Sequence, residues 1–229
     1  RAVGHAVDGG REPIELDLKV LCTYRDHHNS TIGDWVPTIT YTPTRIRVDA
    51  LDEVQPYFVK IERGTYTPIE RWYHKFKHRV ETERGLDDVE DLYAAGQFHV
   101  TLKPGETIAL VASTDESVAL DWQTALYVER KRQKALIEQS GCEDAPGWIQ
   151  QLILAADQFI VERAFGSEIG QSVIAGYHWF GDWGRDTMIA LPGLCLTTKR
   201  YDVAKTILRT FAAFVDRGML PNRFPDQGE

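Results

Sequence analysis

The chain has 229 residues and a formal net charge of -8 at pH 7, because 34 acidic residues outnumber 26 Lys and Arg residues. An acidic chain repels the phosphates of nucleic acids and of anionic lipids, so neither a nucleic acid nor a membrane surface is expected as a partner. Hydrophobic residues make up 43% of the sequence, which is typical of a globular protein. The longest nearly apolar run, residues 188–196, is far shorter than the roughly 20 residues of a membrane span.

The two ends of the sequence indicate a fragment. It begins at Arg1 without the apolar stretch of a signal peptide, and it stops in the loop-like residues 221–229. The cysteines Cys22, Cys142 and Cys195 are far apart and lack the spacing of a zinc site. We therefore expect reduced thiols in a cytoplasmic protein, with Cys195 as a small core residue.

The first half of the chain has the pattern of an antiparallel β-domain. Apolar and charged residues alternate with period two in residues 14–20 and 44–48, as on a half-buried sheet. Three further segments continue this texture: 57–61, 97–102 and 107–112. Between the last two lies Lys103-Pro104-Gly105-Glu106, which predicts a hairpin turn.

The second half is helical in texture. Residues 122–139 are rich in strong helix formers and predict a solvated linker helix that stops at Gly141. Pro146 fits the first turn of a second helix. Six residues form the apolar face of that helix: Trp148, Leu152, Leu154, Ala155, Phe159 and Ile160. A third helix is predicted from Tyr201 to Arg217, with Gly218 as its C-terminal cap.

Between these helices, residues 176–187 read Gly-Tyr-His-Trp-Phe-Gly-Asp-Trp-Gly-Arg-Asp-Thr. Aromatic rings cover the apolar faces of a sugar, and Arg and carboxylate groups bind its hydroxyls through charge-assisted hydrogen bonds. The same residues could instead form a structural ion pair of Arg185 with Asp182 or Asp186 in a Trp-rich core. The segment lacks the Gly-Lys pattern of a phosphate loop, and it contains no Ser or Cys nucleophile.

The run from Trp179 to Leu194 resembles the signature of the archaeal and bacterial glycogen debranching enzymes, the amylo-α-1,6-glucosidase group. Residues 220–225 are similar to the loop after the third barrel helix of that family. Four segments of the β half resemble its N-terminal β-sandwich domain: 24–28, 72–73, 83–87 and 90–92. The resemblance therefore covers almost the whole chain.

The resemblance implies an α+β multidomain fold. Residues 1–120 would be the C-terminal part of a β-supersandwich, and residues 121–145 a linker helix. Residues 146–229 would then hold only the first helices of an (α/α)6 barrel. The implied activity is hydrolysis of the α-1,6-linked glucose at glycogen branch points, with inversion and without a metal or organic cofactor.

Inverting glycosidases set an acid and a base roughly 6.5–9.5 Å apart. Asp182 and Asp186 are not expected to be that pair, because the neighbouring Arg185 favours the ionised form of Asp186, which suits hydroxyl binding rather than acid catalysis. Residues 183–186 also resemble the W-x-R-D motif with which glucoamylases hold the terminal glucose. By that resemblance the catalytic acids lie beyond Glu229 and the fragment alone is inactive, with Asp186 as the fall-back catalytic residue.

The partner implied is an α-glucan, either glycogen or a limit dextrin. Seven residues are expected to bind it: Tyr177, Trp179, Asp182, Trp183, Arg185, Asp186 and Asn222. Two other functions remain open: a glucoamylase-like α-glucosidase of different linkage preference, and a non-catalytic glucan-binding protein. A further barrel acid and base would distinguish an enzyme from a binder.

Other polar clusters have simpler explanations. His27 and His28 are adjacent, so on a strand they point to opposite faces and are not expected to bind a metal. The pairs Glu83-Arg84 and Glu90-Asp91 are expected to fix loops or a domain interface. Five residues are expected to form a covering patch of the β-domain rather than a sugar-binding surface: Trp72, Tyr73, His74, Phe76 and His78.

Overall fold

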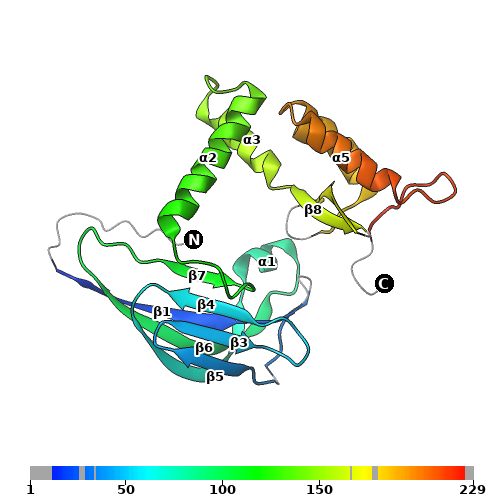
Figure 1. The fold of residues 1–229 in the computed structure, drawn as a ribbon. Coiled ribbons are helices and arrows are strands. Elements are labelled where there is room, and N and C mark those ends of the chain that lie inside the picture. Colours follow the sequence, from blue (N-terminus) through cyan, green and yellow to red (C-terminus); the bar gives the residue numbers. More distant parts are fainter. Residues whose placement is uncertain (1–11, 26–28, 34, 166, 177–179, 225–229) are drawn as a thin grey trace. The chain divides into compact units, whose positions relative to one another are not determined.

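The computed structural model describes residues 12–25, 29–33, 35–165, 167–176 and 180–224. The chain divides into two compact units, residues 1–122 and residues 123–229. The first unit is built mainly from strands, and the second from helices and one hairpin (Figure 1). Among the described residues, no helix combines the length and apolar character needed to cross a membrane.

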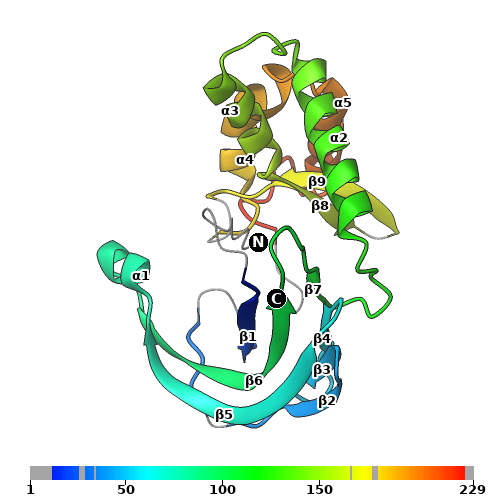
Figure 2. The same ribbon diagram turned by 90° about the vertical axis from the view of Figure 1, so that its left-hand side faces the viewer.

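The first unit contains two antiparallel sheets. One has the strand order β1-β6-β5, formed by β1 (Ile14–Cys22), β6 (Val89–Leu102) and β5 (Thr65–Lys77). The other has the order β2-β3-β4-β7, formed by β2 (Thr38–Thr42), β3 (Arg45–Asp49), β4 (Tyr57–Ile61) and β7 (Leu110–Ser113). Strands β5 and β6 are long and curved (Figure 2), and a short helix, α1 (Arg79–Arg84), separates them in sequence.

The period-two alternation explains the core of this unit. Ile46 and Val48 of β3 point inward and are fully buried, as are Phe98 of β6 and Ile61 of β4. Residues from both sheets form one hydrophobic cluster, so the sheets pack face to face. The strands predicted from alternation at 14–20, 44–48 and 57–61 are confirmed as β1, β3 and β4.

The turn at residues 103–106 forms, but the predicted hairpin is wrong. The Glu106 N–H donates to the Lys103 carbonyl over 3.0 Å, and Gly105 adopts a φ of 83°, as a tight turn requires. Strand β6 pairs with β1 and β5, whereas β7 begins at Leu110 and pairs with β4 in the other sheet. Turn residues reverse the chain locally, but the partner of the next strand depends on which sheet edge is free.

Four α-helices lie in the described residues of the second unit. These are α2 (Trp122–Ser140), α3 (Gly147–Asp157), α4 (Gly184–Leu191), which runs into a π-helical segment at Pro192–Leu196, and α5 (Tyr201–Ala212). The linker helix α2 ends as predicted, because Gly141 follows it with a left-handed φ of 73°. Between α3 and α4 lies a hairpin of β8 (Ile160–Phe165) and β9 (Glu168–Val173) that the periodicity did not reveal.

The second and third predicted helices are shorter in the structure than the sequence predicts. The second helix ends at Asp157, so Phe159 and Ile160 do not belong to its apolar face, and Trp148 and Leu152 on that face are exposed. The third helix, α5, ends at Ala212 rather than at Arg217. Beyond Ala212, the Phe214 ring packs against Phe224, which lies outside the helix, and residues 216–219 form a turn.

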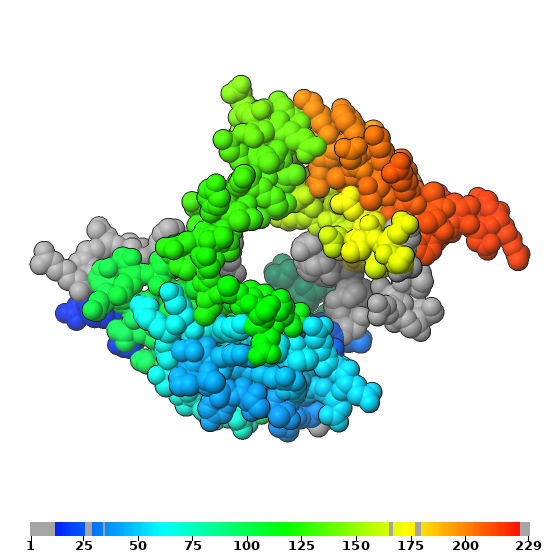
Figure 3. Space-filling view, viewed as in Figure 1, coloured from blue at the N-terminus to red at the C-terminus, as the bar shows by residue number. Residues whose placement is uncertain are grey.

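Gly218 does not cap α5. Asp216 and Met219 exchange backbone hydrogen bonds of 3.1 and 2.8 Å across the residues Arg217 and Gly218. Both of these central residues have positive φ values, 49° and 81°, which is the conformation of a primed hairpin turn. Figure 3 shows the segment after α5, coloured red, protruding from the body of the second unit.

The core of the second unit lies between α5, β9, α4 and the π-helical segment. Its buried residues are Val173, Leu191, Cys195, Ala204, Ile207, Phe211 and Phe224. Cys195 is fully buried, as expected of a small core residue. The observed class is α+β with antiparallel sheets; the barrel implied by the resemblance stays a prediction.

Candidate functional site

Helix α4 begins at Gly184, within the aromatic and acidic segment that the sequence singles out. Trp183 is still extended, with φ −104° and ψ 130°, and the helix carries Asp186 in its first turn. The N-terminus of a helix favours negative charge, because its first N–H groups have no partner within the helix. The helix start therefore sets Arg185 and Asp186 where a polar ligand can reach both side chains.

Gly184 is required by a close approach of the backbone. A Cβ atom at this position would lie 2.4 Å from the carbonyl oxygen of Pro221. The Gly184 N–H donates to the Asn222 carbonyl over 2.9 Å, and Trp183 forms an antiparallel bridge with Arg223. The structure thus brings Asn222 beside the start of α4, although the two lie far apart in the sequence.

Arg185 and Asp186 form only a long, exposed ion-pair contact. Their side chains are 76% and 45% exposed, and Arg185 Nε lies 4.0 Å from Asp186 Oδ2, at the limit of an ion-pair contact. Exposed pairs of this kind contribute little to stability. Both groups are therefore available to a ligand.

Asp182 has a different environment. It is only 5% exposed, and its Oδ1 atom lies 3.5 Å from Arg163 Nη1 on β8, so its ion-pair partner is not Arg185. Its Oδ2 atom is buried and has no hydrogen-bond partner among the described residues. A buried carboxylate normally accepts several hydrogen bonds, so this oxygen differs from most buried polar atoms.

The loop between β9 and α4 is closed at its base. Ile174 and Asp182 form an antiparallel bridge, and the Ala175 N–H donates to the Gly181 carbonyl over 3.1 Å. Phe180 is exposed within this loop. Two predicted aromatic ligands of the sugar, Tyr177 and Trp179, lie outside the described residues.

Sequence reasoning missed Arg163 and Phe224. Phe224 is 1% exposed, and the guanidinium carbon of Arg163 lies 4.9 Å from the centroid of its ring. The sequence carries a signal for the hairpin that holds Arg163, since Gly166-Ser167 between two short runs is typical of a two-residue hairpin loop. No local signal points to Phe224, because its partners come from other elements.

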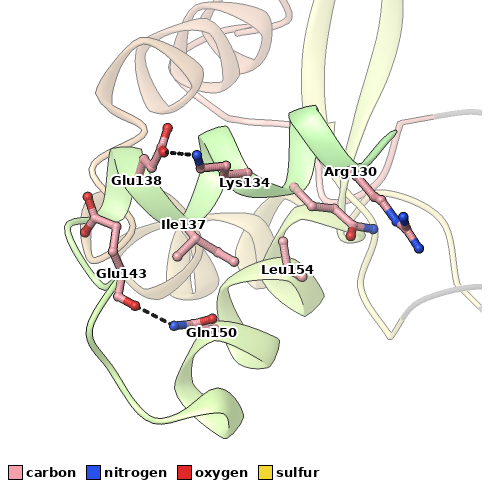
Figure 4. Close-up of a pocket in the computed structure, with 8 residues that line it drawn as sticks. Arg130, Lys134, Ile137, Glu138, Glu143, Gln150 and Leu154 are labelled. Atoms are coloured by element: carbon pink, nitrogen blue, oxygen red, sulfur yellow. Dashed lines mark hydrogen bonds and ion pairs between the residues drawn. The ribbon is translucent and has the colours of Figure 1, made fainter. Parts of the chain in front are cut away.

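Two hollows among the described residues lie away from this segment. A groove of about 440 Å³ lies between α2 and α3, with Ile137 and Leu154 at its floor (Figure 4). Its rim is charged, and Lys134 pairs with Glu138 over 3.4 Å. A second hollow of about 470 Å³ lies between β1 and the β4–β7 pair. The lining residues of the α2–α3 groove are aliphatic, polar and charged.

Potential metal ligands are scattered. The described residues contain no group of three or more His, Cys, Asp or Glu side chains placed to hold a metal ion. His27 and His28 lie outside the described residues.

Comparison with known proteins links both units to one family. Residues 2–109 match the family described as "Glycogen debranching enzyme N terminal", and residues 154–229 match the family described as "Amylo-alpha-1,6-glucosidase". A stretch of 40 residues is 48% identical to the glycogen debranching enzyme of Saccharomyces cerevisiae (strain ATCC 204508 / S288c). It covers 18% of this chain and 3% of the yeast protein. No solved structure matches the chain.

The two family matches follow the order of the two units. The first covers most of the strand-rich unit, and the second contains the hairpin, the start of α4 and the Asn222 segment. The aromatic and acidic segment that carried the resemblance in sequence therefore lies inside the glucosidase match. The chain belongs to the glycogen debranching enzyme family.

Proposed function

We propose that residues 182–186 and 221–224 form the glucose-recognition site of an α-1,6-glucosidase that removes glucose at the branch points of glycogen. The observation that carries this proposal is the exposure of Arg185 and Asp186 at the start of α4, beside Asn222. An exposed cation and carboxylate next to each other match the paired donors and acceptors of vicinal sugar hydroxyls.

In this proposal Arg185 donates hydrogen bonds to the terminal glucose and Asp186 accepts hydrogen bonds from its hydroxyls. The half-buried Trp183 offers an apolar surface to the sugar ring, and Tyr177 and Trp179 are proposed to add further aromatic surface. Asn222 presents an exposed amide.

The reaction itself is proposed to invert the anomeric carbon. An acid and a base outside the 229 residues would perform it, so that this chain alone binds the glucan without hydrolysing it. A cytoplasmic location is part of the proposal, supported by three free cysteines.

The test uses Asp186→Asn in the full-length enzyme that contains these residues. The variant keeps the shape of the side chain and removes its charge. Charge-assisted hydrogen bonds contribute about 1.5–3 kcal/mol, so kcat/KM for a branched limit dextrin should fall roughly 10- to 150-fold. The matched control is Asp202→Asn, since Asp202 is an exposed carboxylate in the first turn of α5 and should leave activity unchanged.

A second substrate separates binding from acid catalysis. α-Glucosyl fluoride has a good leaving group and needs little help from a general acid. A similar loss on limit dextrin and on the fluoride supports recognition of glucose by Asp186. Selective recovery on the fluoride would make Asp186 the acid and contradict the assignment, and no loss on either substrate would contradict the recognition site altogether.

A further inference from the structure

We propose that Arg163 is a positioning residue of the glucose-recognition site, acting through Asp182 and Phe224 rather than by contact with the sugar. The proposal rests on the function proposed above and adds a residue that lies on the hairpin, outside the recognition segment.

Arg163 contacts both segments that form the site. Its Nη1 atom lies 3.5 Å from Oδ1 of Asp182, and its guanidinium carbon lies 4.9 Å from the centroid of the Phe224 ring. A guanidinium group is planar and stays charged, so one face can stack on an aromatic ring while its edge meets a carboxylate. One side chain of β8 thereby links the residue before Trp183 to the residue after Arg223.

The two residues that Arg163 contacts also bond to each other. The Phe224 N–H donates to the Asp182 carbonyl over 3.3 Å, next to the Trp183–Arg223 bridge and the bond between Gly184 and Asn222. Fixing Asp182 and Phe224 therefore fixes both sides of this short antiparallel pairing. The first turn of α4, with Arg185 and Asp186, begins directly after it.

Phe224 and the strand that carries Arg163 are each held by further contacts within the unit. The Phe224 ring packs against Phe211 and Phe214 with centroid distances of 4.6 and 4.7 Å. β8 is held by six-residue pairing with β9, whose Gln171 N–H donates to Thr210 on α5. Arg163 thus connects the recognition segment to a packed part of the unit.

The positive charge of Arg163 compensates the carboxylate of Asp182. Asp182 is nearly buried, and its Oδ2 atom has no hydrogen-bond partner in the described part of the chain. A buried carboxylate that loses its cation is strongly destabilised. Without Arg163 we expect Asp182 to move toward water and to carry the start of α4 with it.

The experiment compares Arg163→Met and Arg163→Lys in the full-length enzyme, with kcat and KM for limit dextrin and the melting temperature as readouts. A displacement of about 1 Å can lower catalysis up to about 100-fold, so Arg163→Met should lower kcat/KM about 10- to 100-fold, mainly through KM. Arg163→Lys keeps the charge but loses the planar stack, so it should fold and recover part of the loss. Adding Asp182→Asn to Arg163→Met should recover part as well, because it removes the uncompensated charge.

Two controls separate positioning from stability. Arg209→Met removes an exposed Arg from α5 and should change nothing. Ile207→Val loosens the same buried cluster and calibrates how far KM responds to a lower melting temperature alone.

The positioning role is wrong if KM in the Arg163 variants rises only as much as the Ile207→Val calibration predicts from their melting temperatures. It is also wrong if KM in these variants does not change. In both cases the recognition site stands as long as Asp186→Asn remains impaired. If Asp186→Asn is also unimpaired, both proposals are wrong. A KM increase beyond the calibration, partly reversed by Lys, supports the proposal.

Discussion

Two carboxylates of this chain are equally buried but differ in the number of hydrogen-bond donors around them. Glu90 in the strand-rich unit and Asp182 in the second unit are each 5% exposed. Glu90 accepts a hydrogen bond of 2.7 Å from Arg25 Nε and one of 3.3 Å from the Thr31 N–H, and His78 Nε2 lies 2.9 Å away. Asp182 has Arg163 at 3.5 Å and one unpartnered oxygen among the described residues.

The electrostatics of Glu90 and its neighbour Asp91 follow from these contacts. Burial alone would raise the pKa of Glu90, but the hydrogen bonds from Arg25 and Thr31 outweigh it and lower the pKa. The Gly33 N–H, the His74 ring and the Lys75 N–H lower the pKa of Asp91 to about 2. The expectation that Glu90 and Asp91 fix loops is confirmed, because Arg25, Thr31 and Gly33 lie outside the strands and bond to these carboxylates.

Glu90 and Asp182 are equally buried, so burial does not distinguish them. They differ in how many hydrogen bonds their carboxylate oxygens accept from the protein. Glu90 and Asp91 have their hydrogen-bonding capacity filled by the protein, as structural groups do. Asp182 has one oxygen without a hydrogen-bond partner among the described residues, and Asp186 is half-exposed. The difference can be tested by removing each feature in turn.

The largest effect on stability is expected from Glu90→Ala. It removes the carboxylate to which Arg25 and the Thr31 N–H donate, and breaking a buried pair of this kind costs about 3 kcal/mol. Urea unfolding followed by fluorescence measures it. Glu83→Ala removes an exposed Glu of α1 and serves as the control. A loss below about 0.5 kcal/mol would mean that the Glu90 network does not hold these loops.

Gly184→Ala should come next. The new Cβ would meet the backbone carbonyl of Pro221, which cannot swing aside as a side chain can, so overpacking should lower stability by about 1–3 kcal/mol. Because the clash separates the start of α4 from Asn222, glucan affinity measured by calorimetry should fall with it. Gly147→Ala is the matched control, since Gly147 also opens a helix and its Cβ would meet nothing within 4 Å. Unchanged affinity in Gly184→Ala would contradict the role of this pairing.

Asp186→Asn should barely change stability, by less than about 0.5 kcal/mol, because the side chain is half-exposed and its contact with Arg185 is weak. The same variant should impair the reaction, as described above. Thermal unfolding and kinetics on one preparation give both values. A stability loss as large as that of Glu90→Ala would place Asp186 with the structural carboxylates.

The smallest effect concerns pH. The pKa of Asp91 is near 2 in the folded chain and 3.8 in its ordinary environment, so its stabilising contribution is complete above about pH 4. It should be lost as pH falls from about 4 towards 2. Melting temperatures across this range should fall less steeply in Asp91→Asn than in the natural chain. Parallel curves would show that Asp91 is not a source of the acid sensitivity.

Local pattern predicted much of both units. Alternation placed β1, β3 and β4, and Gly141 marked the end of α2, because a strand or a helix terminus depends on neighbouring residues. The hairpin β8–β9 was missed, although Gly166-Ser167 is a local signal for it. The early end of α5 was missed because contacts with other elements, such as that of Phe214 with Phe224, decide it.

The sequence by itself determined the chemical character of the site: an Arg and two carboxylates within an aromatic segment. Only the tertiary structure decided which residues surround them. Asn222 reaches the site through a backbone pairing with Gly184, and Asp182 is held by Arg163 from a strand. Periodicity and turn residues encode conformations that are local in the chain, whereas such pairings depend on which edges and buried charges remain free once the core has packed.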